Sequence, residues 1–133
     1  MEPSTAWRFV VVGYVLSVLI EVPVLLMGLS PRHGWRRRVM AGLWLTGCTY
    51  PVVVLVFPYL IHPQWKSVLV SETFAPLAEW GLFVLAFPEP APRSRVDALR
   101  DGLAIIGANL ASFGIGEILH ATGILEKLCD SLR

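Results

Sequence analysis

The sequence is short of charged residues. Asp, Glu, Lys and Arg make up only 16% of its 133 residues, whereas they make up about a quarter of an average soluble domain. Hydrophobic residues account for 55% of the chain, and the mean hydropathy is +0.63. This composition predicts one integral membrane domain over residues 1–133. A net charge of +1, with no basic patch interleaved with aromatics, argues against nucleic acid as a partner.

Several chemical signatures are also missing. The two cysteines, Cys48 and Cys129, form no C-x-x-C motif, so we expect neither a disulfide framework nor a thiol redox motif. The sequence contains no G-x-S-x-G or H-E-x-x-H motif and no glycine-rich phosphate loop. All three histidines fall at the ends of apolar segments, away from any nucleophile that they would activate. The sequence leaves enzymatic activity open without favouring it, and it implies no cofactor.

Four long apolar segments are present instead, at about residues 7–29, 39–61, 67–87 and 103–125. Each is close to the roughly 20 residues that a helix needs to cross the hydrocarbon core of a bilayer. A spanning segment must satisfy its own backbone hydrogen bonds, which favours helices. The pattern predicts an all-α fold, an integral membrane four-helix bundle with short connecting loops. The first segment is longer than the core of a signal peptide and carries Glu21, so we expect it to be retained.

The basic residues predict the orientation. Loops 31–38 and 88–102 hold seven of the eleven Lys and Arg residues, so both loops should be cytoplasmic and both termini outside. Residues 88–92 are proline-rich and should be extended, while residues 96–100 should begin the fourth helix. One basic cluster either anchors this topology or binds anionic lipid head groups, and it comprises Arg32, Arg36, Arg37 and Arg38.

Two carboxylates lie deep in the apolar segments. Glu21 and Glu79 are at similar distances from the starts of the first and third segments, whose helices run in the same direction. An ionisable group inside a bilayer costs roughly 2.5 kcal/mol or more, so it marks a candidate functional site. If the two side chains meet, they should share a proton near neutral pH, as in a proton or cation relay. The alternative is a neutral Glu that joins helices by hydrogen bonds.

Other residues extend this candidate site. Glu72 lies seven residues before Glu79, near the outer surface, and is a candidate access residue. Asn109 belongs to a face of the fourth segment that we expect to look toward the carboxylates, and the small residues of that segment predict close helix packing. A proline lies within each of the first three segments and frees a backbone carbonyl there: Pro23, Pro51 and Pro76.

A metal site near the outer surface is a further hypothesis. Glu117 and His120 form a Glu-x-x-His pair, and His62 and Glu72 should lie at a similar level. Two carboxylates and two histidines suit a divalent transition metal. Metal sites in helix bundles use two such motifs, however, and this chain has one.

Three functional classes therefore remain open. The first is proton- or cation-coupled transport through buried carboxylates, with the bilayer as the environment and a homo-oligomer or a membrane partner subunit completing the protein. The second is a non-catalytic membrane subunit or scaffold, in which the same Glu and Asn residues lock helices together. The third is the membrane-embedded metal site.

Overall fold

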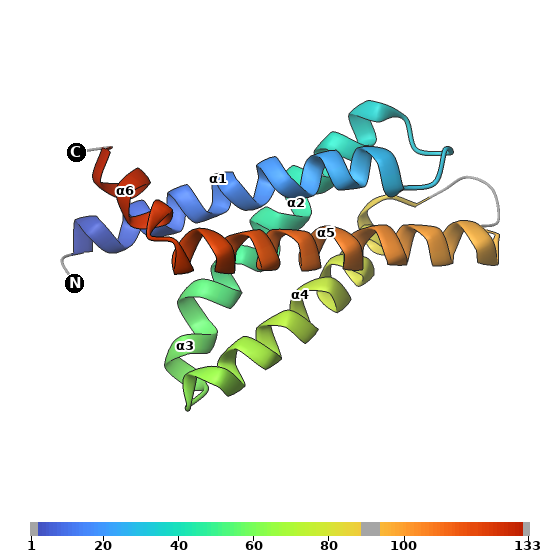
Figure 1. Cartoon of the computed structure of the whole chain (residues 1–133). Helices are drawn as coiled ribbons and strands as arrows, with labels where there is room; N and C mark the ends of the chain where they lie inside the picture. The colour runs from blue at the N-terminus through green and yellow to red at the C-terminus, as the bar shows by residue number, and fades with distance from the viewer. Residues whose placement is uncertain (1–2, 89–93, 132–133) are drawn as a thin grey trace.

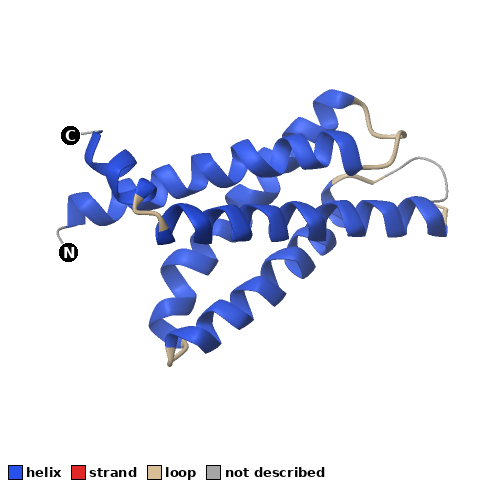
Figure 2. Ribbon diagram, viewed as in Figure 1, coloured by secondary structure: helices blue, strands red, loops and turns tan. Residues whose placement is uncertain are grey.

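The computed structural model describes residues 3–88 and 94–131, and this part of the chain is helical and contains no strand (Figure 2). The all-α prediction is therefore confirmed. The elements are α1 (Pro3–Gly28), α2 (Trp35–Pro51), the π-helix η1 (Val52–Val56), α3 (Phe57–Leu60), α4 (Gln64–Ala86), α5 (Arg95–Ala121) and α6 (Ile124–Ser131).

Four stretches of these helices are long and apolar enough to cross a membrane: Trp7–Gly28, Trp35–Leu60, Gln64–Ala86 and Arg95–Ala121. Helix α1 packs against α5 and α2, and α4 packs against the same two helices from another side. Helix α6 lies beside the start of α1 (Figure 1). The connection from α1 to α2 and the start of α5 lie at the opposite end (Figure 1).

The second apolar stretch, predicted at about 39–61 with a proline that frees a backbone carbonyl inside it, is not a uniform α-helix. It begins at Trp35 and changes at Pro51 into the π-helical turn η1 before it ends as α3. Proline has no amide hydrogen, so it interrupts the regular α-helical ladder, and a π turn accommodates the shifted register. Beyond this turn, α3 and the start of α4 form a V that points away from α1 and α5 (Figure 1).

The fourth apolar stretch was predicted at about 103–125, with residues 96–100 as the start of its helix. Helix α5 begins at Arg95, because the Ser94 hydroxyl accepts a hydrogen bond from the Asp97 amide at 3.0 Å and caps the helix. It ends at Ala121 because Gly123 adopts φ +67°, a conformation that stops a helix. The predicted helical start over 96–100 is confirmed. Of the predicted proline-rich stretch, residues 89–92 lie outside the described part of the chain.

Burial in this fold is the reverse of burial in a water-soluble domain. Glu21 and Glu79 are only 3% and 2% exposed. Leu19 and Leu85, on the same two helices, are 63% and 79% exposed. Single exposed apolar residues are normal on soluble proteins, but here they line the outer faces of all four long helices. The outer surface is therefore apolar, and carboxylates lie inside.

The closest helix contacts occur at glycines other than those predicted. A Cβ at Gly28 would lie 2.8 Å from the Ala104 Cβ, so α1 and α5 approach closely only because Gly28 has no side chain. At Gly107 and Gly116, on the face of α5 predicted for close packing, an added Cβ would meet no atom within 4 Å. The small residues at positions 107 and 116 thus do not create the tight contact, which lies nearer the start of α5.

We predict that Gly28→Ala destabilises the protein by about 1–3 kcal/mol, because the new methyl group would force two helix backbones apart. Gly107→Ala is the matched control and should be neutral or stabilising by up to about 1 kcal/mol, since alanine favours a helix and the site is open. The measurement is unfolding of the purified proteins in mixed micelles of dodecyl maltoside and SDS. Equal stability of the two variants would contradict the close contact.

Candidate functional site

One polar layer crosses the interior, and each long helix contributes to it. Glu21 comes from α1 and Glu79 from α4, so the structure places the two predicted carboxylates in the same layer and along one cavity. Their hydrogen-bond donors come from the other two helices: Thr46 and Thr49 from α2, and Asn109 and Ser112 from α5.

Both oxygens of Glu21 accept a hydrogen bond. The Thr46 hydroxyl donates to Oε2 at 2.5 Å, and the Ser112 hydroxyl donates to Oε1 at 2.7 Å. One donor therefore comes from α2 and the other from α5, which ties α1 to both neighbours. The contact of Ser112 with Glu21 was not predicted from the sequence.

Glu79 repeats this arrangement one helical turn away. The Thr49 hydroxyl donates to its Oε1 at 2.6 Å, and the Asn109 amide donates to its Oε2 at 2.7 Å. Residues three apart on a helix share one face, so α2 and α5 can each supply donors to both carboxylates. No hydrogen bond joins Glu21 directly to Glu79 in the described part of the chain, and the two carboxylates are linked only through donors on the helices that they share, α2 and α5.

The hydroxyl donors allow each carboxyl group to be either charged or protonated without moving heavy atoms. The Thr49 oxygen lies 2.6 Å from Glu79 Oε1 and 3.1 Å from the Leu45 carbonyl of its own helix. When Glu79 is ionised, the Thr49 proton points to the carboxylate. When Oε1 carries a proton, that proton is donated to the Thr49 oxygen, whose own proton turns to Leu45. Asn109 donates to Oε2 in both states.

Glu21 has the same two options. The Thr46 oxygen also lies 2.7 Å from the Gly42 carbonyl, and the Ser112 oxygen lies 3.0 Å from the Asn109 carbonyl. Either hydroxyl can therefore turn its own proton toward its helix and accept a hydrogen bond from the protonated acid. The hydrogen bonds of the layer thus suit both the charged and the protonated form of each acid.

Two cavities that share lining residues lie at the polar layer and next to it. The inner one has a volume of about 160 Å³ and is lined by Glu21, Glu79 and their donors. The outer one has a volume of about 540 Å³ and opens between α3 and α4. Val53, Glu72 and Phe113 line both cavities, so the predicted access residue Glu72 stands at their junction. A polar cavity of the inner size can hold several waters.

The other side of the polar layer is closed by apolar side chains. Leu25, Leu45, Phe83 and Ile105 each lie one helical turn from the polar layer, toward the end where α5 begins. All four are at most 2% exposed and belong to one buried cluster. The two carboxylates are therefore reached from the α3–α4 end and separated from the opposite end.

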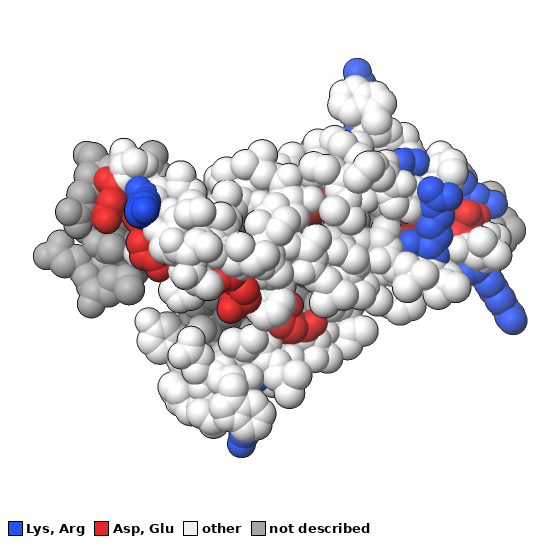
Figure 3. All heavy atoms as spheres, in the orientation of Figure 1, with Lys and Arg blue, Asp and Glu red and all other residues white. Residues whose placement is uncertain are grey.

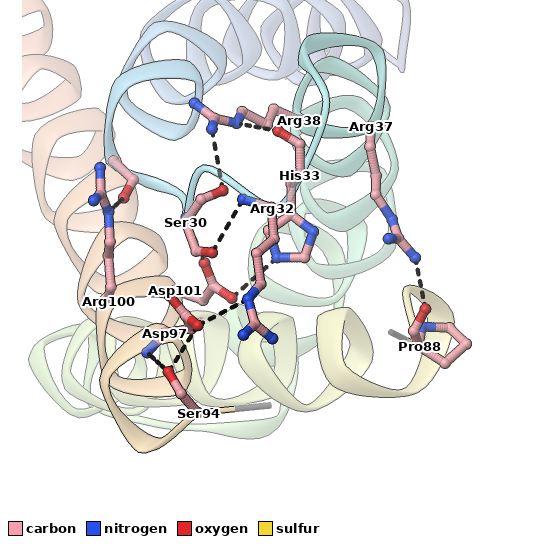
Figure 4. Close-up of polar contacts among 11 residues, drawn as sticks. Ser30, Arg32, His33, Arg37, Arg38, Pro88, Ser94, Asp97, Arg100 and Asp101 are labelled. Carbon is pink, nitrogen blue, oxygen red and sulfur yellow. Dashed lines mark hydrogen bonds and ion pairs between the residues drawn. The ribbon is translucent and has the colours of Figure 1, made fainter. Parts of the chain in front are cut away.

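A second buried polar group lies beyond the apolar layer and was not predicted. Asp101 is fully buried and accepts a hydrogen bond from the Ser30 amide at 2.7 Å, while its other oxygen lies 3.1 Å from His33 Nε2 (Figure 4). The ring of His33 packs edge-on against Phe83. This pair could not be predicted from the sequence, because both residues fall in segments expected to be exposed loops.

The arginine cluster at this end is partly structural. Lys and Arg atoms gather at the end of the molecule where α5 begins (Figure 3). Arg38 turns inward and donates to the backbone carbonyls of Leu26, Ser30 and His33, and Arg100 donates to the Gly28 carbonyl at 2.9 Å (Figure 4). These bonds satisfy carbonyls at the end of α1, which the helix itself leaves unpaired.

The other three loop arginines lie further out. Arg32 pairs with Asp97 at 3.0 Å, and Arg37 donates to the Pro88 carbonyl at 2.9 Å. Arg36 is exposed and stacks over the Trp35 ring. Of the four arginines in loop 31–38, only Arg38 donates to three backbone carbonyls of the protein.

The four residues considered for a metal do not gather. No group of three or more His, Cys, Asp or Glu side chains suited to a metal ion occurs within residues 3–88 and 94–131. His120 lies 3.0 Å from Glu126 of α6, whereas His62 and Glu72 line the outer cavity. Glu117 is exposed on α5.

Comparisons with known proteins assign no family. No protein-family model matches the chain, and no curated protein or solved structure has significant similarity to it. The function must therefore be argued from the site itself.

We predict that Thr49→Val destabilises the protein by about 1–3 kcal/mol, because it leaves Glu79 Oε1 buried without its donor. Thr73→Val is the matched control. The Thr73 hydroxyl bonds only to the Leu69 carbonyl of its own helix and is exposed, so its removal should change stability by less than about 0.5 kcal/mol. Unfolding in mixed micelles measures both, and a Thr49→Val protein as stable as the control would contradict the hydrogen-bond layer.

Arg38→Lys should also lower the stability, by about 1–3 kcal/mol, because a single ammonium group cannot reach three separate carbonyls as the guanidinium does. Arg36→Lys serves as the control, since Arg36 is exposed. The same unfolding experiment compares them. If both variants are as stable as the wild type, Arg38 has no role in holding the end of α1.

Proposed function

We propose that this chain is a multi-pass integral membrane protein whose four long helices form a bundle in the bilayer. The support is the reversed burial: an apolar outer surface around a polar layer, which suits a solvent of lipid. In the proposed orientation, loops 31–38 and 88–102 face the cytoplasm and both termini face outside. Exposed Arg32 and Arg36, with Arg37 beside them, would then contact anionic lipid head groups.

The activity that we propose is the uptake and release of protons by Glu79 and Glu21, coupled to movement of a cation. The observation that carries this proposal is that each carboxyl group is hydrogen-bonded to hydroxyls, which can donate to its charged form and accept a hydrogen bond from its protonated form. Arrays of carboxylates inside membrane proteins commonly serve as proton or ion pathways. Glu79 is the principal proton-binding residue, Glu21 its neighbour, and Glu72 the residue that connects them to the outer cavity.

The cavities reach the carboxylates from one end only, and the apolar layer closes the other. A transporter must expose its site to the two sides in turn, so this arrangement corresponds to one of two required conformations. Four spans are few for a complete transporter, and we therefore propose that the chain works as a homo-oligomer or with a membrane partner subunit.

One observation also favours the second class, a non-catalytic membrane subunit. Every oxygen of Glu21 and Glu79 already accepts a hydrogen bond from another helix, as expected of residues that only hold helices together. The two functions differ in whether a proton enters and leaves. That difference can be measured.

We expect Glu79→Gln to remain folded but to lose the proton exchange. A glutamine amide can accept from Asn109 and donate to Thr49, so it reproduces the protonated acid but cannot ionise. Infrared difference spectra of the protein in lipid, recorded across a pH titration, should show a carboxylic acid band that is weaker or absent in this variant. Vesicles that contain the protein and a pH-sensitive dye should likewise show a proton flux that the variant lacks.

Glu126→Gln is the control, because Glu126 lies on α6 away from the layer and should leave both signals unchanged. Infrared and vesicle signals that are identical in wild type and Glu79→Gln would contradict proton exchange at Glu79. If in addition Glu79→Leu unfolds while Glu79→Gln is stable, the helix-locking function is the better account.

A further inference from the structure

The outer cavity contains a carboxylate that the protein itself does not use. Glu72 has no hydrogen bond or ion pair within the described residues, in contrast to Glu21 and Glu79, whose oxygens are all bonded. It is half-buried, at the junction of the two cavities. A carboxylate in such a place is costly unless something of opposite charge or a proton joins it.

The walls around Glu72 are largely apolar. The outer cavity measures about 540 Å³, within the range of pockets that hold small organic molecules. No Lys or Arg is among its lining residues, so no permanently charged cationic side chain of the wall neutralises the carboxylate. Six of the lining residues have aliphatic, proline or aromatic side chains. They are Val53 and Val54 of η1, Pro58 of α3, Ile61 in the turn after α3, Val68 of α4 and Phe113 of α5.

Charge and shape together define the occupant. A transition-metal ion would need several strong ligands, and the described residues contain no group of three or more His, Cys, Asp or Glu side chains. A lipid chain would match the apolar wall but would leave the Glu72 carboxylate without a partner. A positive group on an apolar body satisfies both, and Phe113 offers an aromatic surface to it.

We propose that the outer cavity binds a lipophilic organic cation, with Glu72 as its counter-ion and Phe113 as part of its apolar wall. This inference deepens the proposed function by naming the class of cation that is exchanged for protons. In Figure 3, acidic atoms are visible between α4 and α5 on a surface that is otherwise uncharged, so a cation can approach from that face.

Bound cation and bound protons should compete, because both neutralise one set of carboxylates. Glu72 lies near enough to Glu21 and Glu117 for their charges to interact. A cation at Glu72 therefore makes a further proton in the inner cavity less favourable, and the proton would leave through the same opening. The titratable groups that face Glu72 are Glu21 from α1, Tyr50 from α2, His62 before α4, Glu79 on α4 itself and Glu117 from α5.

The test uses tetraphenylphosphonium as the probe and the full chain in dodecyl maltoside micelles, with empty micelles as the blank. Equilibrium dialysis should show saturable binding of this cation and none of tetraphenylborate, an anion of the same shape. Glu72→Gln should weaken binding about tenfold or more, since a charged partner is lost. Phe113→Leu should weaken it about two- to fivefold, since it keeps an apolar wall but removes the ring.

Glu126→Gln is the matched control and should bind as the wild type does. Glu72 has no partner in the protein, so Glu72→Gln should fold normally, which circular dichroism verifies. Equal binding of the cation and the anion, or an affinity unchanged by Glu72→Gln, would overturn the cation site.

A second measurement separates this inference from the proton exchange proposed above. Binding in weakly buffered solution should release protons to a pH-sensitive dye, and Glu79→Gln should bind the probe but release fewer. Binding that depends on Glu72 with no proton release in the wild type would uphold the cation site and remove the proton coupling. Proton exchange in the vesicle experiment without binding of tetraphenylphosphonium would uphold the proton exchange and overturn the cation site.

Discussion

The fold depends on keeping two carboxyl groups satisfied in an interior from which bulk water is largely excluded. An uncompensated carboxylate in such surroundings is so costly that all of its oxygens need donors. Glu21 and Glu79 obtain theirs from both α2 and α5, so this requirement fixes how four helices are placed and rotated. Apolar packing alone would not do this within lipid, since lipid chains contact leucine as well as another helix does.

Residue type and spacing predicted the features that follow from the high free energy of polar groups in lipid. These features are the four apolar stretches and the place of Glu21, Glu79 and Asn109 in the buried interior. The donors Thr46 and Thr49 were harder to find, because a threonine in a membrane helix commonly bonds to its own backbone, as both do here. The His33–Asp101 pair could not be found at all, since burial of a loop depends on tertiary packing.

The π turn η1 links the interruption of one helix by proline to the cavity beside the site. Pro51 interrupts α2 just after Thr49, and the π turn that follows carries Val53 into the lining of both cavities. The chain beyond the turn leaves the axis of α2 (Figure 1), and the outer cavity is lined by residues of η1, α3, α4 and α5. Proline here is part of how the cavity is made, and a straight helix would place the same side chains elsewhere.

The unequal closure on the two sides of the polar layer has an electrical consequence in the proposed membrane setting. Water in the cavities is far more polarisable than the apolar layer of Leu25, Leu45, Phe83 and Ile105. A transmembrane voltage would therefore drop mainly across that layer, where about 2.3 kcal/mol acts on each elementary charge per 100 mV. Glu79 would stay near the potential of the side on which the cavities open. A charge crossing the single helical turn beyond it would experience most of the field.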